Sequence, residues 1–197
     1  IASRDATAAR RLFEAGAILL GKTQMVEFAF GGAGINHHHG TPWNPWDLQE
    51  HRLPGGSSSG SGVAVSSGLT SAALGTDTGG SVRIPASFDG LVGLKPTFGR
   101  VSNAGVVPLD STLDSVGPMT RSVGDAALLY DVIRGPDGED AATLEQPIEG
   151  PSDDLNLDLT GVRLCVPREY FWEDVDAETE AAVRATAQVF AELGANV

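Results

Sequence analysis

Two Gly-rich stretches point most clearly to the fold, residues 54–62, PGGSSSGSG, and residues 74–86, LGTDTGGSVRIPA. Both join Gly and Ser directly to apolar residues, which predicts tight turns beside buried elements and argues against a flexible Gly/Ser linker. Glycine permits positive φ and a close approach of the backbone to a ligand. A series of free N–H groups in such a turn suits a phosphate or a developing oxyanion. The two turns are therefore the first candidates for a functional site.

Apolar periodicity on either side of the turns predicts alternating helices and strands. Helices are expected over residues 6–15, 62–69, 122–133 and 177–192, with Asp5 and Asp176 as caps and Gly16 and Gly194 as stops. Short strands are expected over residues 17–20, 71–75 and 162–166, and another begins at residue 195. Residues 31–56 have no sustained period and are expected to form a long loop. This order of elements favours an α/β layer architecture.

Composition and charge limit the class of protein. Of the 197 residues, 41% are apolar and 20% are charged, as in a globular domain. No apolar run approaches the ~20 residues that a membrane helix needs. The net charge of −13 argues against a nucleic-acid or anionic-membrane surface. Residues 1–130 hold 9 basic and 10 acidic side chains, whereas residues 131–197 hold 4 and 16, which predicts a solvated acidic region in the second part.

The chain is expected to be an internal segment, residues 1–197, of a single larger domain that is truncated at both ends. Within it, residues 1–130 would form the core that carries the motifs, and residues 131–197 an acidic connection followed by a strand–helix unit. The lone Cys165 excludes an internal disulfide and fits a reducing compartment. A cytoplasmic location is expected on that ground.

Three familiar site patterns fit poorly. No Lys follows either Gly-rich turn, which argues against a phosphate loop of the Gly-x-x-x-x-Gly-Lys-Ser/Thr type. Residues 56–60, GSSSG, match the elbow of α/β-hydrolases, but a poor strand precedes them and all four histidines lie before the serine. The adjacent His37, His38 and His39 do not share one face, and no Cys or acidic ligand stands at zinc spacing, so no metal site is expected. A histidine base for a serine stays an unsupported alternative.

Together with residues 90–102, GLVGLKPTFGRVS, the two turns resemble the amidase signature family. Three flanking segments agree with it, namely residues 21–28 (GKTQMVEF), 44–47 (NPWD) and 113–123 (LDSVGPMTRSV). The resemblance covers most of residues 5–193. It implies an α/β fold of the amidase signature type, a mixed β-sheet core with helices on both faces, of which this chain holds a part.

The resemblance also implies a Ser–cis-Ser–Lys triad. Ser81 matches the nucleophile, and Ser57 matches the bridging serine that follows a cis peptide bond. The backbone amides of Thr78, Gly79, Gly80 and Ser81 match the turn that holds the oxyanion.

The lysine of the triad has no counterpart among the two lysines of the chain. Lys22 stands in Gly-Lys-Thr and Lys95 in Leu-Lys-Pro-Thr, and neither occupies the Lys-Asp motif of the family. The catalytic lysine is therefore expected upstream of Ile1, with Lys22 as an alternative base. The 197 residues by themselves are expected to be inactive.

The implied activity is hydrolysis of a small-molecule carboxylic amide through an acyl-enzyme on Ser81, without cofactor or metal. One alternative is the A subunit of the glutamyl/aspartyl-tRNA amidotransferase, which releases ammonia from glutamine. That branch usually reads DEFAMG and RQPA where residues 26–31 read VEFAFG and residues 83–86 read RIPA, which favours a general amidase. Expected partners are a second copy of the chain, or the amidotransferase subunits if this alternative holds.

A third alternative is a non-catalytic relative that binds a ligand through the same turns. The presence of both Ser57 and Ser81 argues against it.

Overall fold

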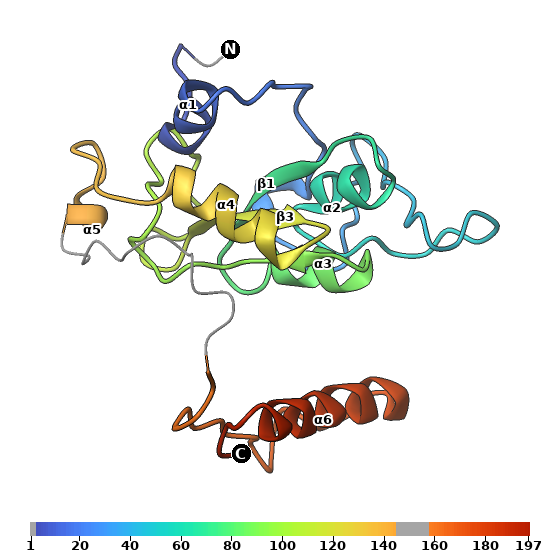
Figure 1. The fold of residues 1–197 in the computed structure, drawn as a ribbon. Coiled ribbons are helices and arrows are strands. Elements are labelled where there is room, and N and C mark those ends of the chain that lie inside the picture. Colours follow the sequence, from blue (N-terminus) through green and yellow to red (C-terminus); the bar gives the residue numbers. More distant parts are fainter. Residues whose placement is uncertain (1–2, 145–157) are drawn as a thin grey trace. The chain divides into compact units, whose positions relative to one another are not determined.

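The structure, a computed structural model, describes residues 3–144 and 158–197 (Figure 1). Contacts along the chain divide it into two compact units, Ile1–Ser152 and Asp153–Val197, which are described separately. The functional division expected after residue 130 stays a prediction; helix α4, Val123–Ile133, spans that position within the first unit.

A three-stranded antiparallel sheet forms the centre of the first unit. Its strands are β1 (Ala72–Asp77), β2 (Val92–Gly93) and β3 (Ser115–Thr120), in the order β1-β3-β2. Strand β3 is central and all of its residues are buried. The strand expected over residues 71–75 is confirmed as β1, and it continues to the start of the second Gly-rich turn. All of these pairings are antiparallel.

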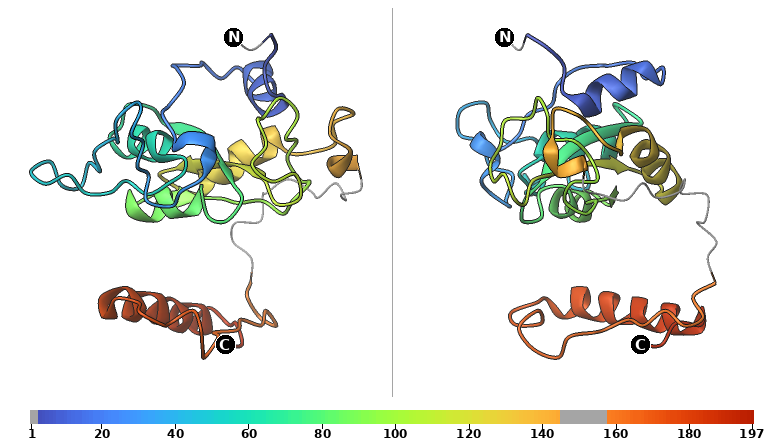
Figure 2. Two further views of the ribbon diagram at one scale, coloured as in Figure 1. Left: turned by 180° about the vertical axis from the view of Figure 1, so that it is seen from behind. Right: turned by 90° about the vertical axis from the view of Figure 1, so that its left-hand side faces the viewer.

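Helices cover both faces of this sheet, as the sequence led us to expect. Successive side chains of a strand point to opposite faces. On one face Val116 of β3 packs with Ala8 of α1 (Thr7–Glu14) and Ile133 of α4. On the other face Met119 packs with Val82 and with Ala86 of α3 (Arg83–Phe88). Figure 2 shows α1 and α3 on opposite sides of the strands.

The small-residue helix after the first turn is α2, Ser59–Ser66, which begins three residues earlier than expected. It packs against β1 and α3. Residues 31–56, expected to be a loop, contain no helix or strand in the structure, and a 3₁₀ turn η1 (Glu27–Ala29) precedes them. The first Gly/Ser turn is therefore fixed between the sheet and α3.

Two expectations for the N-terminal part are wrong. Residues 17–20 form no strand, because no described segment pairs with them, and the side chains of Ile18 and Leu20 are 84% and 71% exposed. Helix α1 begins after Ala6, which makes no side-chain capping bond, so Asp5 is not its cap. The expected stop at Gly16 is confirmed by its φ of +93°. Helix α4 starts as expected, because Ser122 Oγ accepts a hydrogen bond from the Asp125 N–H at 3.1 Å.

The second unit is built around α6, Ala177–Glu192. Its cap is confirmed, since the Asp176 carboxylate accepts hydrogen bonds from the Glu178 and Thr179 N–H groups at 2.9 and 3.3 Å. The strands expected over residues 162–166 and from 195 are reduced to a single parallel bridge between Arg163 and Asn196. A short helix, α5 (Ala141–Leu144), belongs to the first unit.

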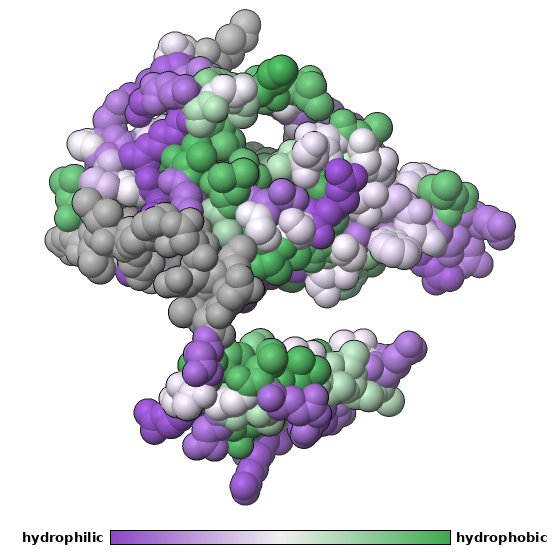
Figure 3. Space-filling model, viewed as in Figure 1, coloured by the Kyte–Doolittle hydropathy of each residue, from purple (hydrophilic) through white to green (hydrophobic). Residues whose placement is uncertain are grey.

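Apolar side chains reach the surface of both units (Figure 3), including Leu128 of α4 and Val183 of α6. Within the described residues, no helix has the length and hydropathy needed to cross a membrane.

Candidate active site

Ser57 lies in the turn that leads into α2 and is completely buried. The Gly56–Ser57 peptide bond is cis, as the resemblance implies. A Cβ on Gly56 would lie 2.5 Å from the Gly31 carbonyl oxygen, so this close approach of two backbones requires glycine. The Ser57 carbonyl accepts a hydrogen bond from the Val26 N–H at 3.0 Å. The Ser57 Oγ has no hydrogen-bond partner among the described residues, which is unusual for a buried hydroxyl.

Ser81 follows β1 and the second Gly-rich turn, directly before α3. The Ser58 N–H donates to the Ser81 carbonyl oxygen at 3.3 Å, so the two turns meet through their backbones. Ser58 Oγ also accepts a hydrogen bond from the Thr76 N–H of β1 at 3.3 Å. The structure thus brings together the two segments that the sequence singled out. The roles of Ser57 and Ser81 stay predictions at this point.

Asp77, the last residue of β1, organises the second turn, a role that the sequence reasoning missed. Its carboxylate is fully buried and accepts backbone hydrogen bonds from Gly80 at 2.7 Å and Val82 at 3.1 Å. Arg83 donates to it from Nε and Nη2, each at 3.0 Å. Burial acts to raise the pKa of Asp77, but the hydrogen bonds from Arg83 and the backbone outweigh burial, so the pKa is lowered.

The same carboxylate engages one of the four amides expected to form the oxyanion turn. Gly80 donates its N–H to Asp77, whereas the N–H groups of Thr78, Gly79 and Ser81 have no acceptor among the described residues. Gly80 adopts a φ of +139°, and a Cβ there would lie 2.6 Å from Cδ1 of Ile84. Three N–H groups of this turn are therefore without an acceptor among the described residues, and their role as an oxyanion site stays a prediction.

A second buried acid braces the turn from the other side. The Thr78 hydroxyl donates to Asp114, which directly precedes β3. The other carboxylate oxygen of Asp114 accepts hydrogen bonds from the backbone N–H groups of Leu109 and Asp110 at 2.8 and 3.1 Å. The turn is thus held by hydrogen bonds that it donates to two carboxylates, Asp77 at the end of β1 and Asp114 directly before β3.

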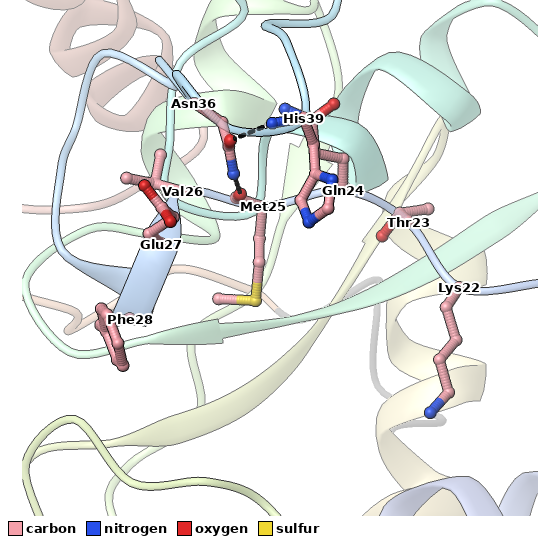
Figure 4. Close-up of a pocket in the computed structure, with 9 residues that line it drawn as sticks. All are labelled: Lys22, Thr23, Gln24, Met25, Val26, Glu27, Phe28, Asn36 and His39. Atoms are coloured by element: carbon pink, nitrogen blue, oxygen red, sulfur yellow. Dashed lines mark hydrogen bonds between the residues drawn. The ribbon is translucent and has the colours of Figure 1, made fainter. Parts of the chain in front are cut away.

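Neither lysine contacts the serines. Lys22 is exposed at the rim of a pocket lined by residues 22–28 with Asn36 and His39, and its amine points away from the last two (Figure 4). Neither Ser57 nor Ser81 lines this pocket. Lys95 Nζ donates to the carbonyl oxygen of Pro96 at 2.8 Å. Neither amine hydrogen-bonds to a candidate catalytic serine within the described residues.

The histidine run is part of a loop that Asn36 organises. Asn36 Oδ1 accepts hydrogen bonds from the backbone N–H groups of His38 and His39 at 2.9 and 2.7 Å, and its amide donates to the Met25 carbonyl at 2.7 Å (Figure 4). Among the described residues, no group of three or more His, Cys, Asp or Glu is placed to hold a metal ion. Asn36 was not singled out from the sequence, although Asn before a turn is a common backbone acceptor.

Comparison with known proteins agrees with this geometry. A family model described as Amidase matches residues 1–197. The chain belongs to the amidase family. It is 47% identical over 197 residues to the A subunit of the glutamyl-tRNA(Gln) amidotransferase of Chromohalobacter salexigens, covering 100% of this chain and 40% of that protein. The chain thus spans about 40% of the length of the curated relatives it matches.

Solved structures of amidase-family proteins share the fold. The crystal structure of the A subunit of the glutamyl-tRNA(Gln) amidotransferase from Thermotoga maritima matches with a TM-score of 0.91 at 42% identity, over 98% of this chain and 42% of that one. The peptide amidase from Stenotrophomonas maltophilia matches with a TM-score of 0.82 at 38% identity, over 98% of this chain and 41% of that one. The α/β amidase signature fold expected from the motifs is therefore confirmed.

Proposed function

We propose that the complete protein hydrolyses a carboxylic amide through an acyl-enzyme on Ser81, with Ser57 as the proton relay. The observation that carries the proposal is the meeting of the two Gly/Ser turns at the hydrogen bond from the Ser58 N–H to the Ser81 carbonyl. In a chain of the amidase family, that contact joins the segment of Ser81 to that of Ser57, whose buried hydroxyl has no partner among the described residues. Dividing amide hydrolysis into acylation and deacylation replaces one difficult step by two easier ones.

In the first step the Ser81 oxygen attacks the amide carbonyl carbon while its proton passes to Ser57, and the Ser57 proton passes to the base. The carbonyl oxygen becomes an oxyanion next to the N–H groups of Thr78, Gly79 and Ser81. The C–N bond then breaks as the same relay returns a proton to the leaving amine. In the second step water attacks the acyl-enzyme, the base takes its proton through Ser57, and Ser81 leaves with a proton.

None of the described residues is assigned as the base that accepts the proton from Ser57. The family pattern calls for a lysine, and burial lowers the pKa of a lysine toward the neutral range in which it accepts a proton. The proposal places this lysine outside residues 1–197, so these residues alone should not turn over an amide. Robust hydrolysis by the 197-residue chain would instead point to Lys22 or to a histidine as the base.

The names of the relatives favour a second candidate of the same chemistry. Amidotransferase A subunits reach 50% identity over 193 residues, as in the protein of Myxococcus xanthus. In that case glutamine would be the amide, and the partners would be the other amidotransferase subunits. Residues 26–31 and 83–86 depart from the usual sequence of that branch, and this supports the general amidase as the first choice.

Glutamine hydrolysis separates the two candidates. The complete protein should be assayed for ammonia release from glutamine and from a panel of simple amides, alone and after gel filtration with the partner subunits of the amidotransferase. A general amidase acts alone on simple amides. Glutaminase activity that appears only in the complex would reject the general amidase and support the amidotransferase.

A non-catalytic ligand-binding relative is the third candidate, and a fluorophosphonate probe tests it. Failure of the probe to react with Ser81 in the complete, folded protein would favour that candidate. Self-association into a homodimer and the cytoplasmic location expected from the sequence stay predictions.

A further inference from the structure

Asp89 is a buried acid that the proposed mechanism does not use. It directly follows α3, and only 1% of the residue is exposed. Its backbone is well satisfied, because its carbonyl accepts hydrogen bonds from Trp46 Nε1 at 2.9 Å and Ser66 Oγ at 2.8 Å. Neither carboxyl oxygen has a hydrogen-bond partner among the described residues. A buried carboxylate without partners is costly, so the group calls for an explanation.

The carboxyl group lies between the two helices that follow the candidate catalytic serines. Helix α2 begins two residues after Ser57, and α3 begins two residues after Ser81. A Cβ on Gly62, in the middle of α2, would lie only 2.3 Å from Oδ2 of Asp89 and 3.2 Å from Cβ of Pro85 in α3. The Asp89 carboxyl therefore fills the space that the missing side chain of Gly62 leaves in the seam between α2 and α3.

Among the described residues, no side chain of opposite charge is available to Asp89 in this seam. Helix α2, SGSGVAVS, contains no titratable side chain, and the one charged residue of α3 is Arg83, which binds Asp77 at the far end of the helix. In the loop that packs on Asp89 through Trp46, Asp47 is paired with Arg52. Burial alone raises the pKa of Asp89 to about 7. The uncharged acid is the form that fits this packing.

We propose that Asp89 is a positioning residue for the serine pair. Its uncharged carboxyl group, packed on Gly62, holds α2 and α3 at the separation that keeps Ser57 aligned with Ser81. An ionised carboxylate needs hydrogen-bond donors at both oxygens. Trp46 Nε1 and Ser66 Oγ are already bonded to the Asp89 carbonyl, so water has to enter the seam instead. Helices α2 and α3 must then separate, and Ser57 moves with α2. The proposal rests on the proposed function of the two serines.

The direction of the pH effect follows from proton binding. The folded protein keeps the Asp89 proton up to about pH 7, whereas an unfolded chain releases it near pH 4. Between these values each pH unit lowers the folding equilibrium constant by up to tenfold, and the loss is complete above pH 7. Alignment of the serines is lost as the pH rises through about 7. Asparagine has the same shape and does not ionise, so Asp89→Asn removes both effects.

The test uses the complete protein as wild type, as Asp89→Asn and as Glu14→Gln, a control that removes an exposed carboxylate from α1. The rate of fluorophosphonate labelling at Ser81 and the unfolding equilibrium in urea are measured from pH 5 to 9. The ratio of the wild-type to the Asp89→Asn labelling rate should fall about tenfold between pH 6 and pH 8, and the control should follow the wild type. A ratio that is constant with pH would overturn the proposal.

A second pair of variants covers the case in which Asp89→Asn does not fold. Gly62→Ala should destabilise the wild type, because its methyl group needs the space of the carboxyl, and it should be tolerated when combined with Asp89→Ala. Additive effects of the two substitutions would contradict the packing. If the wild type is not labelled at Ser81 at any pH, the proposed function fails. The pH dependence of the unfolding equilibrium would then still show whether the folded protein keeps Asp89 uncharged up to about pH 7.

Discussion

Replacement of Asp77 by alanine tests how far one buried carboxylate supports the candidate site. The substitution removes the acceptor of the Gly80 and Val82 N–H groups, which lie 2.7 and 3.1 Å from it. A buried donor left without an acceptor costs about 1–3 kcal/mol, and relief of the buried charge offsets part of this cost. Arg83 is half exposed, so its side chain regains water and adds little. We expect the free energy of unfolding to fall by about 2–4 kcal/mol.

The functional effect of Asp77→Ala should exceed what the loss of stability explains. Without the carboxylate, the turn over residues 78–81 loses its fixed shape, and a lost oxyanion donor typically costs about 10²–10³ in rate. The assay is the rate of fluorophosphonate labelling of the complete protein at a temperature where circular dichroism shows that the variant is folded. Asp77→Asn, which keeps one acceptor oxygen, should lie between the wild type and Asp77→Ala. Labelling of folded Asp77→Ala at the wild-type rate would show that the Asp77 carboxylate does not hold the turn in its reactive shape.

Three further substitutions extend the account. Ser57→Ala should leave the urea midpoint nearly unchanged, because the Ser57 Oγ has no hydrogen-bond partner among the described residues. The same substitution should slow acylation of Ser81 by about 10²–10⁴. A loss of stability as large as the loss of rate would contradict a relay role. Gly80→Ala should lower the free energy of unfolding by about 1–3 kcal/mol, because φ is +139° and the new Cβ would lie 2.6 Å from Cδ1 of Ile84. An unchanged melting temperature would speak against this backbone conformation. Hydrogen bonds from Ser102 and Thr7 lower the pKa of Asp137 to about 2, so its stabilisation is present above about pH 4 and lost as the pH falls toward 2. Asp137→Asn should therefore unfold more easily than the wild type by about 1–2 kcal/mol at pH 7 and equally easily near pH 2; a difference that persists at pH 2 would exclude ionisation as its cause.

Elements with local signals were predictable from the sequence. Strand β1 follows from a short apolar run before a Gly-rich turn, and α6 from the cap at Asp176 and the stop at Gly194. Residues 17–20 carry the same kind of apolar run, but a strand forms only against a partner, and the described residues supply none. The local pattern therefore showed which segments could form a strand, and pairing with another segment determined which of them did.

The candidate site divides in the same way. Ser57 and Ser81 stand in motifs that the sequence displays directly, and the structure brings their turns together. The roles of Asp77 and Asp89 depend on burial, which the sequence does not display, and that of Asp89 also on packing against a different helix. Aspartate is rarely fully buried, so the sequence offered no reason to expect an acid packed against Gly62.

The key step of the proposed reaction is acylation of Ser81, with Ser57 as the proton relay. Its most direct test is peptide mapping by mass spectrometry of the complete protein after reaction with a fluorophosphonate. We expect one adduct, on Ser81, that is absent from Ser81→Ala and forms slowly in Ser57→Ala. An adduct on any other residue, or one that persists in Ser81→Ala, would contradict it.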